Sequence, residues 1–253
     1  MPAGLVRESL PFACTEAFQS FTMCHAAVVM TCAAVGLSII HAGRVTRGTA
    51  AEKRLRRAWA WLIVFSQVII VSYWLLPGKY DLQRSLPLHI CDLAPWAAAA
   101  ALLTNLRWAR TMTYFWGIGL CTQAFVTPVI EEGWTHGAFW YFWIQHTQIV
   151  ATAGYLLVVD RYRPTWYDFA VGTGTSVLYV LAMLAFNEVM NTNYGYVGRS
   201  SPEARTIVDS LGSWPIRVLW MSLLVTGVFA LLTLVWRAPA RPSDTSAADA
   251  DRA

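Results

Sequence analysis

The sequence contains little charge for its length. Only 13% of the 253 residues are Asp, Glu, Lys or Arg, whereas 56% are hydrophobic. A typical soluble domain carries about 25% charged residues, so this composition excludes an ordinary soluble domain. It indicates a polytopic membrane protein instead.

Lysine is especially scarce, because Lys53 and Lys79 are the only two in the chain. Neither falls in the middle of a long apolar run. A retinal-binding photoreceptor needs a lysine inside the membrane to form a Schiff base, and this class is therefore excluded.

Cysteines are few, and none of the five is spaced as C-x-x-C. This spacing argues against a disulfide framework. A buried free cysteine behaves as a small hydrophobic residue, so we expect Cys24, Cys32 and Cys121 to serve in packing. Cys91 is treated separately because of its polar neighbours.

Long apolar runs dominate what remains. A membrane helix needs about 20 predominantly apolar residues. Seven runs qualify, at about 18–41, 58–77, 86–104, 111–130, 139–159, 167–189 and 214–236. The sequence thus predicts an all-α, polytopic membrane helix bundle of about seven transmembrane helices. It divides into an extracytoplasmic segment at 1–17, the transmembrane domain at 18–236 and a disordered cytoplasmic tail at 237–253.

The distribution of basic residues predicts the orientation of these runs. The stretch from Arg44 to Arg57 holds six Lys or Arg residues and follows the first run directly. Basic loops stay in the cytoplasm, which places the N-terminus outside and the C-terminus inside. The predicted inner segments then carry 13 of the 19 basic residues. The net charge of +4 is explained by topology, and no nucleic-acid partner is implied.

A polar cluster interrupts the third run at its start. Residues 85–92 read Ser-Leu-Pro-Leu-His-Ile-Cys-Asp, with Ser85 as a candidate N-cap. Ionisable groups within a membrane usually face a protein interior or a water-filled cavity. Similar polar residues on other runs fall within about 2 to 12 Å of the outer surface. With this cluster they predict a cavity open to the outer leaflet, and they are His25, Cys91, Asp92, Gln123, His146 and Glu188.

Helical spacing separates the cluster into two faces. His89 and Asp92 are three residues apart and share a face, whereas Cys91 lies about 200° around the helix from His89. If Cys91 is a nucleophile, its base must come from another run. His146 is the best candidate by depth, and His25 is the second.

Several motifs now resemble a known family. In order they are Leu86–Asp92, Phe115–Gly117, Gln123-Ala124, Thr127-Pro128, Gln145-His146, Asn193-Tyr194 and Leu211–Pro215. Together, over about residues 60–220, they resemble the YwaF-type bacterial integral membrane proteins. That group is similar to the eukaryotic transmembrane-protein-164 family of cysteine-dependent phospholipid acyltransferases.

The resemblance implies that Cys91 and His146 form an essential catalytic pair. The corresponding hypothesis is acyl transfer between a phospholipid and a lysophospholipid through a Cys91 thioester, in a bacterial cytoplasmic membrane and without a metal or cofactor. Gln123 or Gln145 would donate to the oxyanion, and Asp92 or Glu188 would orient the imidazole. The expected supporting or substrate-binding residues are His25, His89, Asp92, Gln123, Gln145, Glu188, Asn193 and Tyr194.

Other classes of protein remain open from the residues alone. A transporter or lipid-binding protein would use the same polar cavity without covalent chemistry. A thiol lipid hydrolase would pass the acyl group to water. A metal or haem protein would use His25, His89 and His146 as ligands.

Overall fold

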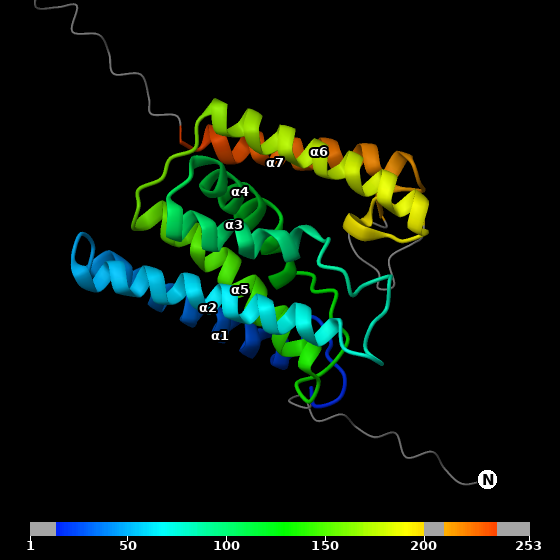
Figure 1. The fold of residues 1–253 in the computed structure, drawn as a ribbon, viewed down its shortest axis with the longest axis horizontal. Coiled ribbons are helices and arrows are strands. Elements are labelled where there is room, and N and C mark those ends of the chain that lie inside the picture. Colours follow the sequence, from blue (N-terminus) through cyan, green and yellow to red (C-terminus); the bar gives the residue numbers. More distant parts are fainter. Residues whose placement is uncertain (1–13, 200–209, 237–253) are drawn as a thin grey trace, which may run out of the picture.

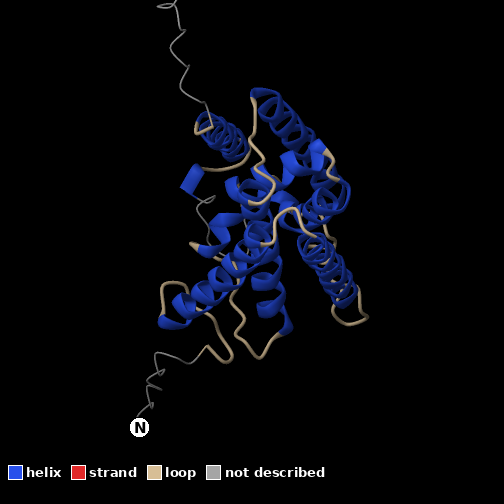
Figure 2. Cartoon of the chain, turned by 90° about the vertical axis from the view of Figure 1, so that its left-hand side faces the viewer, coloured by secondary structure: helices blue, strands red, loops and turns tan. Residues whose placement is uncertain are grey.

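A computed structural model describes residues 14–199 and 210–236, and this part of the chain is all-helical (Figure 1, Figure 2). The helices are α1 (Met23–Val45), α2 (Ala50–Trp74), α3 (Ile90–Thr104), α4 (Arg107–Gly119), α5 (Gly137–Val158), α6 (Trp166–Met190) and α7 (Ile216–Leu234), with the short 3-10 helices η1 (Cys121–Phe125) and η2 (Tyr194–Tyr196). The predicted all-α fold is confirmed for these residues. The predicted tail at 237–253 lies outside them.

Helix α5 occupies the middle of the bundle. It packs against α1, α3 and α4, while α6 and α7 lie side by side along one flank and α1 and α2 form the opposite flank (Figure 1). Helices α1 and α2 contact α5 and α3, respectively, whereas α6 and α7 contact α4.

Small residues allow the central helices to approach closely. The α3 residues Ala94, Ala98 and Ala101 are completely buried. A Cβ added at Gly117 of α4 would lie 3.0 Å from the Cβ of Ala153 on α5. Close backbone approach at small residues is the usual mode of helix packing in membranes, where the hydrophobic effect does not drive helices together.

Within the described part of the chain, four helices have the length and apolar composition to cross a membrane: α1, α2, α6 and α7. Helix α3 has 15 residues and α4 has 13, which correspond to about 22 and 20 Å. The hydrocarbon core of a bilayer is about 30 Å thick. The membrane assignment is supported, and the count of seven spans stays a prediction.

The expected continuous run at 111–130 is wrong in detail. The α-helix begins earlier, at Arg107, and ends at Gly119; η1 and irregular chain follow. Glycine is a poor helix former, and Pro128 disfavours helix at the residue before it. These residues shorten the helix and bring η1 beside the N-terminal half of α5.

The expectation that Cys24 serves only in packing is also wrong, because Cys14 and Cys24 form a disulfide. The segment before α1 runs beside the loop preceding α5, where Ala17 pairs with Glu132. The chain then turns at Phe21, whose φ is 63°, and enters α1. This reversal brings the two cysteines together, with a Cα–Cα distance of 6.3 Å. Spacing could not show it, because the pairing depends on where the loop at residues 131–134 lies.

The disulfide gives a first prediction. Cys14→Ser should lower the free energy of unfolding by about 2 to 3 kcal/mol, because the closed loop restricts the unfolded chain. Thermal unfolding in detergent without reductant measures this change. Cys32→Ser is the control, since Cys32 is a free cysteine on the same helix as Cys24. Equal stability of Cys14→Ser and wild type, together with a non-reduced mass showing all five thiols free, would contradict the pairing.

Candidate functional site

The polar cluster lies at the N-terminus of α3. The helix begins at Ile90 with His89 as its N-cap, not at Ser85 as expected. Ser85 instead accepts a hydrogen bond from the backbone N–H of Asp81, at 2.8 Å. Pro87 explains part of the difference, because the residue before a proline avoids helical geometry. Cys91 and Asp92 therefore lie in the first turn of α3.

Two tyrosines hold the chain that leads into this turn. The hydroxyl of Tyr194 donates to Leu82 O at 2.8 Å and accepts from Leu86 N at 3.0 Å. Tyr179, on α6, donates to Leu88 O at 2.8 Å. Tyr194 was expected near the site, whereas Tyr179 was missed because a tyrosine inside an apolar helix carries no distinctive sequence signal.

Asp92 and Gln145 join α3 to α5. One carboxylate oxygen of Asp92 accepts from the backbone N–H of His89 at 3.0 Å, and the other accepts from Gln145 Nε2 at 3.1 Å. The same Nε2 atom donates to the backbone carbonyl of Cys91. Both N–H bonds of the Gln145 amide are thus engaged in positioning the turn, and its expected role as an oxyanion donor stays a prediction.

Pro95 explains why the Cys91 carbonyl needs a donor from another helix. In a regular helix this carbonyl would accept from the N–H of residue 95, four positions later. Proline has no N–H, so the intrahelical bond is missing. Gln145 supplies the replacement from α5. The spacing of Cys91 and Pro95 could have revealed this requirement from the sequence.

His146 follows Gln145 on α5 and is 6% exposed. Its Nδ1 lies 2.7 Å from the carbonyl oxygen of Phe142. A carbonyl can only accept a hydrogen bond, so Nδ1 carries the proton and Nε2 presents a lone pair. This is the tautomer that a general base requires. The ring packs on Phe142, with centroids 4.4 Å apart.

Cys91 is a half-buried free cysteine that packs against the main hydrophobic core. Its sulfur and the His146 ring, both in the described part of the chain, are not joined by a direct hydrogen bond in this structure. The pairing of Cys91 with His146 stays a prediction.

His25, the second candidate base, is occupied at both ring nitrogens. Nδ1 accepts from the backbone N–H of Phe21 at 2.9 Å, and Nε2 lies 3.2 Å from the carbonyl of Phe125. These bonds tie the start of α1 to η1. His146 is the better candidate because its Nε2 has no such bond to a described residue.

His89 contributes to the shape of the site. Its Nδ1 accepts from the backbone N–H of Gly195 at 3.3 Å. The ring lies against Tyr194 and Tyr196, with centroid distances of 5.1 and 5.4 Å. His89 therefore connects the start of α3 to η2.

Three other predicted residues form different contacts. Glu188 forms two hydrogen bonds with Arg199, at 2.9 and 3.0 Å, and does not orient His146. Asn193 accepts from the backbone N–H of Gly198 at 2.8 Å. Gln123 is exposed on η1. In the structure, Gln145 thus bonds both Cys91 and Asp92, and His146 is the residue that follows Gln145 on α5.

The long apolar helices define a helical membrane protein. A family model described as the TMEM164 family matches residues 17–233, and the chain belongs to this family. No curated protein and no solved structure matches the chain.

The link between Gln145 and Pro95 gives a second prediction. Gln145→Leu should lower the free energy of unfolding by about 2 kcal/mol, because it leaves the Cys91 carbonyl and an Asp92 oxygen unpaired. In a Pro95→Ala background the loss should be smaller, since the alanine introduced there has an N–H that can donate to the Cys91 carbonyl. Thermal unfolding of the four proteins in the cycle measures this coupling.

Gln148→Leu is the matched control for that cycle. Gln148 lies on the same helix and bonds Ser66 at 2.9 Å, away from Cys91. The loss in free energy of unfolding caused by Gln148→Leu should be the same with and without the Pro95→Ala substitution. An equal cost of Gln145→Leu in the wild-type and Pro95→Ala backgrounds would disprove the replacement bond.

Proposed function

We propose that this protein is a membrane-embedded acyltransferase that moves a fatty acyl chain between a phospholipid and a lysolipid through a thioester on Cys91. The observation that carries the proposal is the arrangement of α5 against the start of α3. Gln145 holds the Cys91 backbone, and the next residue is a histidine with Nε2 as acceptor. Membership of the TMEM164 family supports it.

The reaction proceeds in two balanced half-reactions. His146 Nε2 takes the thiol proton, and the thiolate attacks the ester carbonyl carbon of the donor lipid. The carbon–oxygen ester bond breaks, the lysolipid oxygen takes the proton from His146, and an acyl thioester remains on Cys91. A second lysolipid hydroxyl then gives its proton to His146, attacks the thioester and releases the thiolate.

Transition-state charge is stabilised by the start of α3. The backbone N–H groups of Asp92 and Leu93 bond the His89 carbonyl, whereas the N–H of Cys91 has no intrahelical acceptor. This N–H serves as the oxyanion donor in this proposal. His146 approaches Cys91 by adjusting the two side chains when lipid binds, since catalytic hydrogen bonds often tighten only in the substrate complex.

The proposed location is a bacterial cytoplasmic membrane, with several spans and the N-terminus outside. The basic residues from Arg44 to Arg57 support this orientation. The disulfide between Cys14 and Cys24 supports it too, because disulfides persist in oxidising compartments.

Acyl exchange tests the proposal directly. Purified protein is given phospholipid and isotopically labelled lysophospholipid, and labelled phospholipid is measured. Cys91→Ala should abolish the exchange, and His146→Ala should lower its rate by about 10² to 10⁴-fold through loss of the base. Cys32→Ala, which removes a thiol from α1, should retain the wild-type rate.

Three outcomes would reject this function. Equal exchange by wild type and Cys91→Ala would rule out the thioester. Release of free fatty acid in place of acylated lysolipid would show a thiol hydrolase. Saturable lipid binding without any turnover in the wild type would instead indicate a transporter or lipid-binding protein.

A further inference from the structure

A second polar region lies at the opposite end of α3 from Cys91. It is a cleft of about 770 Å³ between the start of α2, the end of α3, the first turn of α4 and the chain after α5. The cleft lies about 18 Å from Cys91, because 12 residues of helix separate Cys91 from Leu103. It is therefore separate from the proposed acyl-transfer site.

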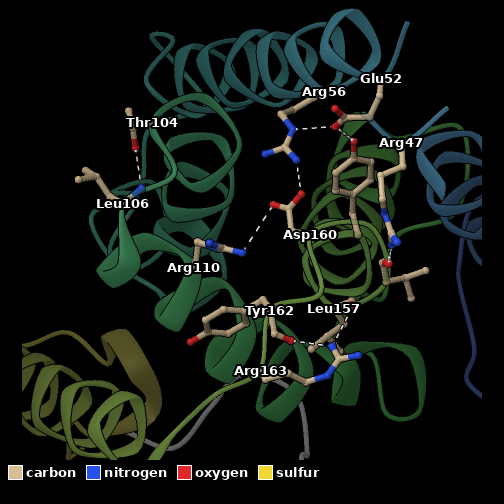
Figure 3. Close-up of polar contacts among 12 residues, drawn as sticks. Arg47, Glu52, Arg56, Thr104, Leu106, Arg110, Leu157, Asp160, Tyr162 and Arg163 are labelled. Carbon is tan, nitrogen blue, oxygen red and sulfur yellow. Dashed lines mark hydrogen bonds and ion pairs between the residues drawn. The ribbon is translucent and has the colours of Figure 1, made fainter. Parts of the chain in front are cut away.

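The cleft carries an excess of positive charge. Four cationic residues line it, Lys53, Arg56, Arg57 and Arg110, against two carboxylates, Glu52 and Asp160. Both carboxylates are paired with Arg56, although Asp160 Oδ2 has no hydrogen-bond partner among the described residues (Figure 3). Glu52 accepts from Arg56 at 2.9 Å and from Tyr155, while Asp160 accepts from Arg56.

Arg110 is incompletely satisfied by these partners. Its Nη2 is 3.9 Å from Asp160 Oδ2, which is too long for a hydrogen bond, and its buried Nε has no hydrogen-bond partner among the described residues (Figure 3). Buried donors without partners are uncommon in native structures. An anion in the cleft would supply an acceptor for Nη2 of Arg110, since the buried Nε is closed to ligands.

Lys53 and Arg57 complete the positive surface. They are exposed on the first turns of α2 and form no ion pair with any described residue. Lysine and arginine side chains of this kind bind phosphate oxygens through charge-assisted hydrogen bonds. The side chains suit a phosphate group better than a neutral ligand.

The cleft also has an apolar wall, formed by Trp61, Leu102 and Leu103, beside the polar residues Thr104 and Asn105. Trp61 is 61% exposed and Leu103 is 41% exposed, and both line it. Exposed tryptophan at the border of an apolar helix is typical of a membrane interface. Basic and apolar walls side by side suit an amphiphile whose phosphate faces the cations and whose chain follows α2.

We infer that this cleft binds the phosphate headgroup of an anionic phospholipid in the leaflet that faces the basic end of the bundle. Arg110 and Arg57 contact the phosphate oxygens, Lys53 adds charge, and Trp61 and Leu103 contact the acyl chain. The site does not depend on Cys91 chemistry.

Binding of short-chain lipids to the purified full chain tests this inference. The probes are dioctanoyl phosphatidylglycerol, dioctanoyl phosphatidylcholine with the same tails, and inorganic phosphate. Native mass spectrometry and thermal unfolding report binding. Wild type should bind phosphatidylglycerol more tightly than phosphatidylcholine. The Lys53→Gln/Arg57→Gln variant should bind phosphatidylglycerol at least about tenfold more weakly than wild type does.

The matched control is Arg44→Gln/Arg54→Gln. It removes the same charge from exposed residues at the same end, and neither residue lines the cleft. Its affinity should stay within about threefold of wild type. All four substituted side chains are exposed, so both double variants should fold, and their unfolding curves without lipid verify this.

Three results would overturn the inference. Equal binding of phosphatidylcholine and phosphatidylglycerol would show that the cleft does not require a lipid with net negative charge. Equal losses in the two double variants would show general attraction to the basic surface. Inorganic phosphate binding as tightly as the lipid, and displacing it, would assign the cleft to a soluble phosphate compound.

Discussion

The site depends most directly on the amide of Gln145. It bonds the Cys91 carbonyl, which Pro95 leaves without a helical partner, and one oxygen of Asp92. An unpaired polar group in apolar surroundings costs about 1 to 3 kcal/mol, and water is scarce within a membrane. These hydrogen bonds therefore oppose sliding and rotation of α5 against α3. His146 is the next residue of α5, so the hydrogen bonds of Gln145 also position His146.

The two ends of the bundle differ in their electrostatics. The start of α3 gathers Asp92, His89 and the tyrosines that hold residues 86–88. The other end brings Arg56 and Arg110 to Asp160 (Figure 3), and Lys53 and Arg57 line the same cleft. Between them lie the buried alanines of α3, which carry no charge. The fold therefore separates a region suited to acyl chemistry from one suited to anionic headgroups.

Sequence reasoning recovered the all-helical class, the membrane character and the family, because apolar runs and ordered motifs are local properties. It failed where distant segments decide the outcome. The Cys14–Cys24 disulfide depends on the loop near Glu132, and the start of α3 at Ile90 depends on Tyr194 and Tyr179. The role of Gln145 could not be predicted without knowing that α5 lies beside the Cys91 carbonyl, which Pro95 leaves without a helical N–H donor. The seven-span count and the Cys91–His146 pair remain predictions.

Detection of the acyl-enzyme tests the central claim most directly. The protein would be incubated with a phospholipid carrying an alkyne-tagged acyl chain, without lysolipid acceptor, and Cys91 would be mapped by peptide mass spectrometry. We predict an acyl group on Cys91 that hydroxylamine releases, as expected for a thioester, and that added lysophospholipid removes. Turnover of the lipid with an unmodified Cys91, or a label on Cys32 or Cys121 instead, would contradict the account.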